Sequence, residues 1–551
     1  MAGFSEVLIA QQGGIESLAE IPESAHSLDA LVEMAEKNQG LGVDEAASLI
    51  AWGRDPARRG EIHAAASCAR ERLAPHTVEF IIPVYLTSFC QNECLYCGYR
   101  KSNPIAERIR LELEDFDKQL ELICSWGHRQ IELVLSDDPE FGPDLLARYV
   151  ESTRRKLDAM GGGVVALCSP VYEQRDYARL RAAGLDWVVE WQETYHQPHF
   201  DRWHFVGSRK RHFESRLDIW DNTIAAGIRK VGLGALLGLY DWRFDVLATV
   251  EHGNYLRRTY GIEPHALGIP RLKPARGVLA SQKPSRFSVS DDDFRLILDV
   301  YHLAFPHSRL FFNTRESYEF NLSMVAPGDL FTVDCETLPG GYLRRHLPGQ
   351  FSTHDYPDRW KVVETLAGRG LSSRYLECET AVTTTETSAP EAVDVDLKGW
   401  VEEHQQVRAG LENWRAILAW LGVHRGEDPV ERQAALSALR MVLYFFKTFV
   451  ITHCRNEEGV LYHAFGLQVP EASGQIQRLR AQHERLGVDL DKFERQLVSY
   501  SLSGDPSVLL SIGDRVVREL EQHLEEEESF ARNESGSRPA DLPRASLPAT
   551  R

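Results

Sequence analysis

The sequence predicts an α/β fold, a βα barrel, followed by an all-α four-helix bundle, and three observations lead to this prediction. From Glu79 onward, short β-branched or apolar runs alternate with longer helical segments, which favours βα units and a parallel sheet closed partly or wholly into a barrel. Residues 383–396 are rich in Thr, Pro and acidic side chains without an apolar period, as in an inter-domain linker. Beyond them lie four long amphipathic segments, the pattern of a helical bundle.

The domain boundaries follow from the same patterns. We expect a helical N-terminal segment over residues 1–75, the barrel with a C-terminal extension over 76–380, a linker over 381–396, the bundle over 397–531 and a disordered tail over 532–551. The expected strands are EFIIPVY, QIELVL, GVVALC, WVVEWQ, RKVGLGALLGL and RLFFNT. In barrels of this kind the chemistry takes place at the C-terminal ends of the strands, so candidate residues are sought there.

Composition and charge restrict the partners. A formal net charge of −19 argues against a nucleic-acid or anionic membrane surface, so we expect a small-molecule substrate, no nucleic acid and no membrane. The N-terminus lacks a basic segment followed by an apolar run, and the apolar stretch around Leu443–Ile451 is interrupted by Lys447 and is too short to span a bilayer. We therefore expect a cytoplasmic protein. Nine cysteines, three of them in one cluster, suit reduced thiols and metal binding rather than a disulfide framework.

The first expected strand leads into LTSFCQNECLYCGYRKSN, where three residues separate Cys90 from Cys94 and two separate Cys94 from Cys97. Three thiolates can bind three irons of a [4Fe-4S] cluster and leave the fourth iron open. The open iron can chelate the amino and carboxylate groups of S-adenosylmethionine (SAM), and Tyr96 beside the last cysteine is a candidate cofactor contact. A zinc site is the alternative, but such sites usually offer four ligands and no second Cys or His pair follows at a suitable distance. The loop therefore predicts a radical SAM enzyme.

Residues from about 40 to 380 resemble the family that contains the 2-iminoacetate synthase of thiamine synthesis, the tyrosine lyase of hydrogenase maturation and the tryptophan lyase of indolic-acid synthesis. The resemblance rests on the runs CLYCGYRKSN, WQETYHQPHF, RLDIWDNTIAAGIRKVGLGALLGLYDWR, GIPRLKPARG, NTRES and TLPGGY, in this order. It implies that the reduced cluster cleaves SAM and that the 5′-deoxyadenosyl radical takes a hydrogen from the amino group of tyrosine or tryptophan, after which a carbon–carbon bond breaks. It also implies an electron donor such as a flavodoxin or a ferredoxin.

Four residues near strand ends are candidates to contact SAM or substrate. Gly232 and Gly234 remove side chains where adenine could lie against backbone, although tight packing between a strand and a helix needs glycine too. Glu193 and Tyr195 lie just beyond a strand end, from which they could reach SAM or substrate, and Glu193 is also a candidate catalytic residue. The alternative for both is a position on a solvated loop.

Two arginines are candidates to hold the substrate. Arg315, after the strand RLFFN, could bind a substrate carboxylate with both arms of its guanidinium, and Arg271 is a second candidate. Either arginine could instead form a plain structural ion pair.

Three departures from the family pattern limit what the resemblance implies. Where the family usually has Gly-Glu after the second strand, for the SAM amino group, this chain has Asp137 and Asp138, and Asp138 could substitute with a shorter reach. Residues 332–335 replace the family's Ser-rich stretch, so the substrate or the bond cleaved can differ. Only Cys378 lies near the end of the domain, so the second cluster-binding cysteine set of the hydrogenase-maturation enzyme is missing and production of carbon monoxide and cyanide is not expected.

The four C-terminal segments each place a histidine on an apolar face, and two of them add a glutamate one turn later: His404, His453 with Glu457, His483, and His523 with Glu527. A lone histidine on such a face is usually a satisfied core residue. Six converging polar groups would each cost about 2–7 kcal/mol if buried without a metal or hydrogen bonds. Imidazoles with bridging carboxylates inside a four-helix bundle suit a diiron centre.

Residues 397–531 resemble the hemerythrin-like domains, including the iron- and oxygen-sensing type, through HCRNEEGVLYHAF and HLEEEESF. The resemblance implies two iron ions with the four histidines as terminal ligands and the two glutamates bridging. His463 and the remaining acids of residues 525–528 are expected on a solvated face. A seventh ligand of the oxygen carriers would fall near Gly487, which has no side chain to bind a metal, so simple reversible oxygen storage is not expected.

Three functions remain open from the sequence. In the first, the diiron bundle oxidises the product of the barrel with O2. In the second, the same lyase carries the bundle as a sensor of O2 or iron, or as a scavenger that protects an oxygen-labile cluster. In the third, which is not catalytic, the protein is an iron–sulfur scaffold that donates metal to a partner.

Overall fold

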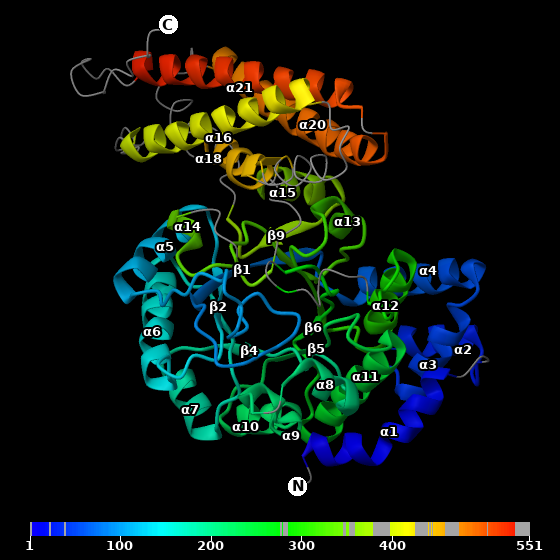
Figure 1. Cartoon of the computed structure of the whole chain (residues 1–551). Helices are drawn as coiled ribbons and strands as arrows, with labels where there is room; N and C mark the ends of the chain where they lie inside the picture. The colour runs from blue at the N-terminus through cyan, green and yellow to red at the C-terminus, as the bar shows by residue number, and fades with distance from the viewer. Residues whose placement is uncertain are drawn as a thin grey trace, which may run out of the picture. The chain divides into compact units, whose positions relative to one another are not determined.

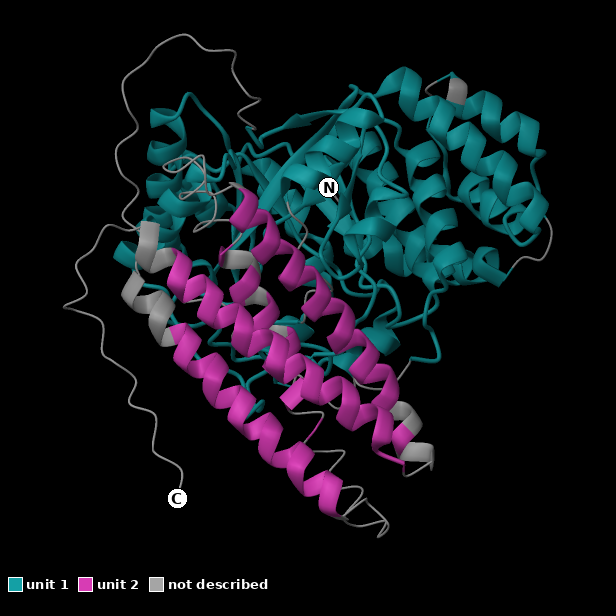
Figure 2. Ribbon diagram, turned by 90° about the horizontal axis from the view of Figure 1, so that it is seen from above, with its two compact units in different colours: residues 1–383 teal, residues 384–551 magenta. Residues whose placement is uncertain are grey.

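The computed structural model describes residues 3–20, 24–37, 40–205, 207–275, 278, 285–344, 349–351, 359–377, 397–424, 439, 442–443, 445–457, 473–503 and 505–534. The chain divides into two compact units, Met1–Thr383 and Thr384–Arg551, shown in different colours in Figure 2. The predicted linker over 381–396 and the part of the predicted tail beyond residue 534 lie outside the described residues.

A closed barrel of parallel strands forms the centre of the first unit (Figure 1). Its strands are β1 (Thr77–Thr87), β2 (Gln130–Leu135), β3 (Val164–Cys168), β4 (Trp187–Val189), β5 (Val231–Gly234), β6 (Ala266–Gly268), β7 (Arg309–Phe312) and β8 (Leu330–Thr332). Strand β1 pairs with β2 on one side and with β8 on the other, which closes the ring. A short strand, β9 (Ser372–Arg374), pairs with the beginning of β1. The predicted α/β barrel is therefore confirmed.

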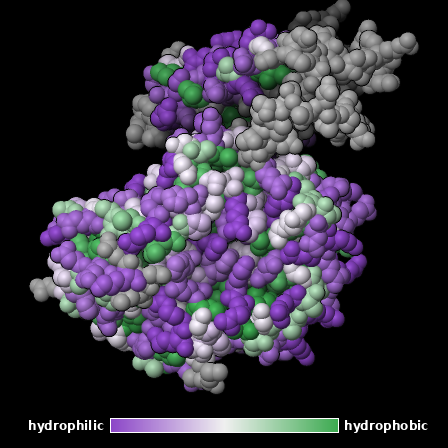
Figure 3. Space-filling view, turned by 180° about the vertical axis from the view of Figure 1, so that it is seen from behind, coloured by the Kyte–Doolittle hydropathy of each residue, from purple (hydrophilic) through white to green (hydrophobic). Residues whose placement is uncertain are grey.

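Helices cover the outside of the barrel because its strands are apolar on both faces and must be buried on both. After the N-terminal segment, the helices of this unit are α5 (Leu113–Ser125), α6 (Pro143–Ala159), α7 (Gln174–Ala182), α8 (Gln197–Trp203), η1 (Arg209–Arg211), α9 (Phe213–Leu217), α10 (Ile219–Ala225), α11 (Trp242–Tyr260), α12 (Asp291–Ala304), α13 (Tyr318–Leu322), α14 (Gly341–Arg344) and α15 (Arg359–Gly368). On the face of this unit seen in Figure 3, hydrophilic residues cover most of the surface and hydrophobic ones gather in scattered groups.

The N-terminal helices belong to the same unit as the barrel. They are α1 (Phe4–Glu20), α2 (Leu28–Glu36), α3 (Val43–Trp52) and α4 (Pro56–Leu73), and they pack against α11 and α12. Arg70 of α4 is fully buried and donates to the backbone oxygens of Pro306, Ser308 and Pro327. The predicted helical segment over residues 1–75 therefore forms a layer of the barrel unit.

The second unit is a bundle of long helices: α16 (Leu397–His424), the π-helical turn η3 (Phe446–Val450) continued by α18 (Ile451–Asn456), α20 (Ser473–Ser503) and α21 (Ser507–Glu534). In its core, the centroid of the Trp414 ring lies 4.6 Å from the centroid of the Phe446 ring and 4.8 Å from that of the Phe493 ring. The apolar faces expected from the helical periodicity thus pack together. Among the described residues, no helix is both long and apolar enough to cross a membrane.

Candidate active site and metal centre

A cavity of about 600 Å³ lies at the C-terminal end of the barrel. The loop after every barrel strand contributes to its lining, with Cys90, Asp137, Ser169, Glu193, Leu236, Pro270, Arg315 and Cys335 following β1 to β8 in that order. This volume falls in the range of about 300–1,000 Å³ that is typical of small-molecule sites. The cavity is therefore the candidate active site of the first unit, at the end of the barrel where the sequence predicted it.

The cysteine loop lines this cavity with Cys90, Cys94 and Cys97. Asp137 holds the beginning of the loop, since its backbone oxygen accepts from the Gln91 amide at 3.0 Å and its carboxylate accepts from the Asn92 side chain at 2.9 Å. The loop is therefore fixed by hydrogen bonds that do not involve the sulfur atoms.

The three thiols suit a cluster with one open iron. Burial raises the pKa of Cys90 to about 11, and burial also raises the pKa of Cys94 and of Cys97. The iron ions of a cluster would compensate the cost of a buried thiolate charge, because a thiol that coordinates a metal is deprotonated. Three sulfurs from one loop at the wall of a ligand-sized cavity leave room for SAM at the fourth iron.

Tyr96, the candidate cofactor contact, also lines the cavity. Its hydroxyl lies 2.8 Å from Nε2 of His204, whose Nδ1 lies 2.7 Å from the backbone oxygen of Phe200. His204 and α8 thus fix the position of the tyrosine within the cysteine loop.

Glu193 is held in a strained backbone conformation beside the cavity. Its φ of 73° is in the left-handed region, which costs a residue other than glycine about 1–3 kcal/mol. Its carboxylate accepts a hydrogen bond from Lys210 Nζ at 2.5 Å. Burial alone raises the pKa of Glu193, but the positive charges of Lys210 and Arg216 outweigh it and hold this pKa below its usual value. Glu193 is therefore an ionised carboxylate at the wall of the cavity.

Arg315 lines the same cavity, and its guanidinium lies 3.8 Å from the centroid of the Phe351 ring. Within the described part of the chain, no carboxylate lies within ion-pair distance of this guanidinium. Burial lowers the pKa of Arg315 from its usual value, yet an arginine stays protonated at neutral pH. A half-buried cation in a cavity of this kind favours an anionic ligand.

Asp138 does not occupy the position predicted for it, because its carboxylate is already engaged away from the cavity. It accepts from Arg110 Nε at 2.6 Å and Nη2 at 3.0 Å, and from the Thr87 hydroxyl at 2.7 Å. Its neighbour Asp137 lines the cavity instead. The chain turns directly after β2, where the Asp138 amide donates to the Ser136 backbone oxygen at 2.9 Å, and Arg110 and Thr87 hold the Asp138 carboxylate away from the cavity.

Tyr195 and the two glycines also lie outside the cavity lining. The Tyr195 hydroxyl lies 3.1 Å from His252 Nδ1, and its ring packs beneath α1 against Phe4. A Cβ on Gly232 would lie 2.9 Å from the Val189 side chain, and a Cβ on Gly234 would lie 2.6 Å from the backbone oxygen of Gly268. The structure thus assigns these glycines to close packing against the neighbouring strands β4 and β6, rather than to the packing of a strand against a helix that was the alternative from the sequence.

Arg271 forms the structural ion pair that was its alternative. Its Nε lies 2.8 Å from Glu316 Oε1 and its Nη1 lies 2.7 Å from Asp291. Its guanidinium also lies 4.7 Å from the centroid of the Phe294 ring. Of the two candidate arginines, only Arg315 lines the cavity.

Several charged residues of the cavity were not among the sequence-based candidates, and Lys210 and Glu132 are two of them. Lys210 lies in the basic run SRKRH and pairs with Glu193 in the folded barrel. Glu132 on β2 lines the cavity at 5% exposure, and burial raises its pKa to about 8. A glutamate inside the apolar run QIELVL was the signal for this second residue.

In the second unit, the six predicted ligands are all buried: His404, His453, Glu457, His483, His523 and Glu527. Glu457 Oε1 lies 3.1 Å from His404 Nε2 and 2.9 Å from His453 Nε2. The other oxygen, Oε2, lies 3.5 Å from His483 Nε2. The carboxylate of Glu457 therefore faces two histidines with one oxygen and a third with the other, as a bridging ligand does.

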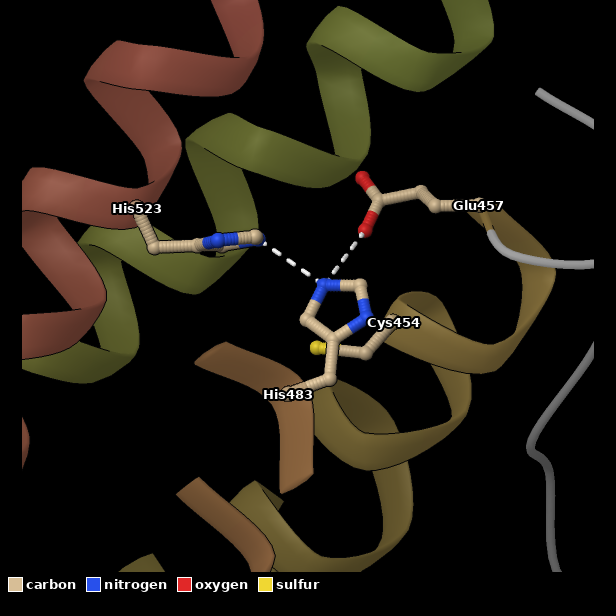
Figure 4. A group of neighbouring side chains, drawn as sticks. All are labelled: Cys454, Glu457, His483 and His523. Atoms are coloured by element: carbon tan, nitrogen blue, oxygen red, sulfur yellow. Dashed lines mark hydrogen bonds and ion pairs between the residues drawn. The ribbon is translucent and has the colours of Figure 1, made fainter. Parts of the chain in front are cut away.

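The remaining contacts complete the group. Glu527 Oε2 lies 3.5 Å from His404 Nε2 and 3.3 Å from His523 Nε2. The Nε2 atoms of His483 and His523 are 2.9 Å apart, and Figure 4 shows these two rings with Glu457 and Cys454. The ligand atoms form two groups, and within each group they lie within 4.8 Å of one another. The first group consists of His404, His453, Glu457 and Glu527. The second consists of Cys454, Glu457, His483 and His523.

Acceptors on the far side of the histidines orient the rings. Nδ1 of His404 lies 2.9 Å from Glu528 Oε1, and Nδ1 of His453 lies 2.7 Å from Glu403 Oε2. Hydrogen bonds of this kind fix the tautomer so that Nε2 faces the metal. The expectation that Glu528 lies on a solvated face is therefore wrong. His463 lies outside the described residues.

The charges of this group also suit cations. Burial opposes protonation of His404, but hydrogen bonds with Glu457, Glu527 and Glu528 outweigh it and raise its pKa to about 11. Two buried carboxylates thus draw positive charge into the site, and metal ions would supply it with the imidazoles neutral. Nitrogen and carboxylate donors of this kind suit iron.

Comparison with known proteins agrees with both units. Residues 84–249 match the radical SAM superfamily, and residues 395–530 match the hemerythrin HHE cation binding domain. The chain is 34% identical to 2-iminoacetate synthase of Salmonella typhimurium over 303 residues, which cover 54% of this chain and 77% of that protein. It is 32% identical to 2-iminoacetate synthase of Escherichia coli over 351 residues, which cover 62% of this chain and 88% of that protein.

Solved structures share the fold. HydG, a maturase of the [FeFe]-hydrogenase, aligns with a TM-score of 0.61 at 23% identity, over 96% of this chain and 98% of that chain. Methylornithine synthase (PylB) aligns with a TM-score of 0.52 at 18% identity, over 62% of this chain and 97% of that chain. Together these matches confirm the resemblance found from the sequence runs.

Proposed function

The chain belongs to the family of radical SAM enzymes that includes 2-iminoacetate synthase and carries a hemerythrin domain, and on this basis we propose that its barrel cleaves a carbon–carbon bond of an aromatic amino acid. Cys90, Cys94 and Cys97 would hold a [4Fe-4S] cluster. When bound and reduced, that cluster supplies the 5′-deoxyadenosyl radical from SAM. The observation that carries the proposal is that one cavity contains both the cysteine loop and Arg315, a half-buried cation suited to an amino-acid carboxylate.

Arg315 binds the carboxylate of the substrate in this proposal. Stacking on Phe351 fixes the plane of the guanidinium, so both of its arms can meet the two carboxylate oxygens. This pairing positions the α-amino group of the substrate within the cavity that the cysteine loop also lines.

In this proposal Glu193, a negatively charged residue in contrast to Arg315, binds SAM. Its carboxylate is ionised and accepts from Lys210, and the remaining lone pairs are suited to an ammonium or a ribose hydroxyl. The strained backbone of Glu193 fixes where this carboxylate lies.

Glu132 binds the ring of the substrate. Because its pKa is about 8, this side chain is mostly a neutral carboxylic acid at pH 7 and can both donate and accept a hydrogen bond. A phenol hydroxyl or an indole N–H would satisfy it, which favours tyrosine or tryptophan over phenylalanine.

The test is anaerobic reconstitution with iron, sulfide, SAM and a reductant, followed by assay of 5′-deoxyadenosine and amino-acid fragments. We expect fragments from tyrosine or tryptophan and a strong loss with Arg315→Lys. Arg271→Lys is the matched control, since it keeps a charged partner for Glu316 outside the cavity. Equal losses in the two variants, or 5′-deoxyadenosine without fragments, would contradict the proposal.

For the bundle, we propose that the two groups of ligand atoms would hold two iron ions, with Glu457 as the ligand that both groups share. The fusion of both units in one chain supports a centre that oxidises the product of the barrel, with O2 as the oxidant. The test is to expose the anaerobic product to air with the iron-loaded protein and with His483→Ala. A product unchanged by the iron-loaded protein would exclude this role.

A second candidate role, scavenging or sensing O2, is favoured by the small cavity beside the centre. This cavity of about 170 Å³ is lined by His483 and His523 among others, and it is smaller than typical sites for drug-sized ligands. A protective role predicts that His483→Ala leaves the anaerobic product unchanged and shortens the lifetime of the [4Fe-4S] cluster in air. An unchanged lifetime would remove this candidate.

A further inference from the structure

We propose that Cys454 is a thiolate ligand of the metal position formed by His483 and His523, an inference that rests on the proposed diiron centre. Cys454 lies on α18 directly after His453 and is buried at 2% exposure. Its sulfur and one ligand atom each of Glu457, His483 and His523 lie within 4.8 Å of one another. Figure 4 shows the sulfur beside the ring of His483, one nitrogen of which faces Glu457 and His523.

The two metal positions are not equivalent. The first group offers the nitrogens of His404 and His453 with the carboxylates of Glu457 and Glu527. The second group offers two histidines and the shared Glu457, and Cys454 supplies its fourth member. One position is thus bound by nitrogen and oxygen alone, while the other gains a soft sulfur donor.

The geometry favours Cys454, rather than a residue of the facing helix α20, as the fourth ligand of the second metal position. One turn after His483 on α20 stands Gly487, and a Cβ built there would meet nothing within 4 Å. That turn of α20 therefore brings no donor to the second position, whereas α18 brings a sulfur atom into it.

The alternative is that Cys454 only fills space, because a buried cysteine often behaves as a small apolar residue. Its sulfur, however, lies among three ligand atoms as well as against the apolar core of the bundle. Binding requires no redox partner, since the sulfur forms a bond to the metal and its proton passes to solvent.

The test uses Co²⁺ as the probe in the full-length chain, because sulfur bound to Co²⁺ gives a charge-transfer band in the near ultraviolet. Cys90, Cys94 and Cys97 are replaced by alanine in every sample, so that the cluster loop cannot contribute. We expect two Co²⁺ ions per chain with a thiolate band. Cys454→Ser and Cys454→Ala should abolish the band and weaken the second ion by more than roughly 10-fold, since even outer partners of metal ligands are worth 10–100-fold.

Cys124→Ser is the matched control, since Cys124 is equally buried at 2% exposure but lies in the barrel unit. It should leave the band unchanged, and circular dichroism checks that each variant is folded. A band that survives in both Cys454 variants, or two bound ions without any band, would overturn the role of Cys454 and leave the two-metal centre in place. Absence of bound ions in the starting protein would instead overturn the two-metal centre itself.

Discussion

Replacing Glu132 by glutamine should change how the stability of the barrel depends on pH. Burial in the cavity raises the pKa of this carboxyl from 4.5 to about 8, whereas in the unfolded chain it ionises near its ordinary value. Between these two values the unfolded state has released a proton that the folded state retains. The unfolding free energy therefore falls as pH rises through this window, by about 1.4 kcal/mol per pH unit from this residue.

Glutamine does not titrate, so the variant lacks this contribution. The unfolding free energy of Glu132→Gln minus that of the parent chain should rise by on the order of 4 kcal/mol between pH 5 and pH 8. Urea unfolding of the iron-free chain measures both values, and the second unit cancels because both proteins share it. The exposed Glu364 gives the matched control, Glu364→Gln, which removes a carboxylate from the surface of α15. A difference for Glu132→Gln that does not vary with pH would refute the reasoning.

Three further substitutions test other parts of the site. Arg315→Lys should raise KM for the amino acid by more than roughly 10-fold, because lysine lacks the two-armed donor, and steady-state kinetics would contradict this if only kcat changed. Asp138→Asn should leave SAM affinity unchanged within roughly 3-fold but lower the melting temperature, because Asp138 pairs with Arg110 rather than lining the cavity. Calorimetry measures the second effect and SAM titration the first. A loss of SAM binding would support the predicted role of Asp138 as a contact of the SAM amino group. Glu528→Gln should weaken iron binding about 10–100-fold through His404, and an unchanged iron content at limiting iron would count against this.

Local patterns explain why much of the site was predictable. The three cysteines share one loop, so their spacing alone brings them together, and the bundle histidines recur with the helical period of 3.6 residues. The expected strands were long apolar runs. Strands β6 and β8, by contrast, are three residues each and were not expected, whereas the equally short β4 lies in the longer expected run WVVEWQ.

Tertiary contacts explain what the sequence could not reveal. Adjacent acids at 137 and 138 differ only in the side of the strand end to which each points, and Arg110 decides the outcome for Asp138. Tyr195 is covered by α1, a helix almost two hundred residues earlier in the chain. Lys210 gains its role from Glu193, which lies beside it only in the folded barrel.

The most direct test of the central claim is the fate of the hydrogen atom taken by the 5′-deoxyadenosyl radical. In anaerobic turnover with tyrosine or tryptophan in D2O, the exchangeable amino group of the substrate carries deuterium. The account predicts 5′-deoxyadenosine that contains one deuterium, together with fragments of the amino acid, measured by mass spectrometry. Unlabelled 5′-deoxyadenosine with the amino-acid skeleton intact would contradict it.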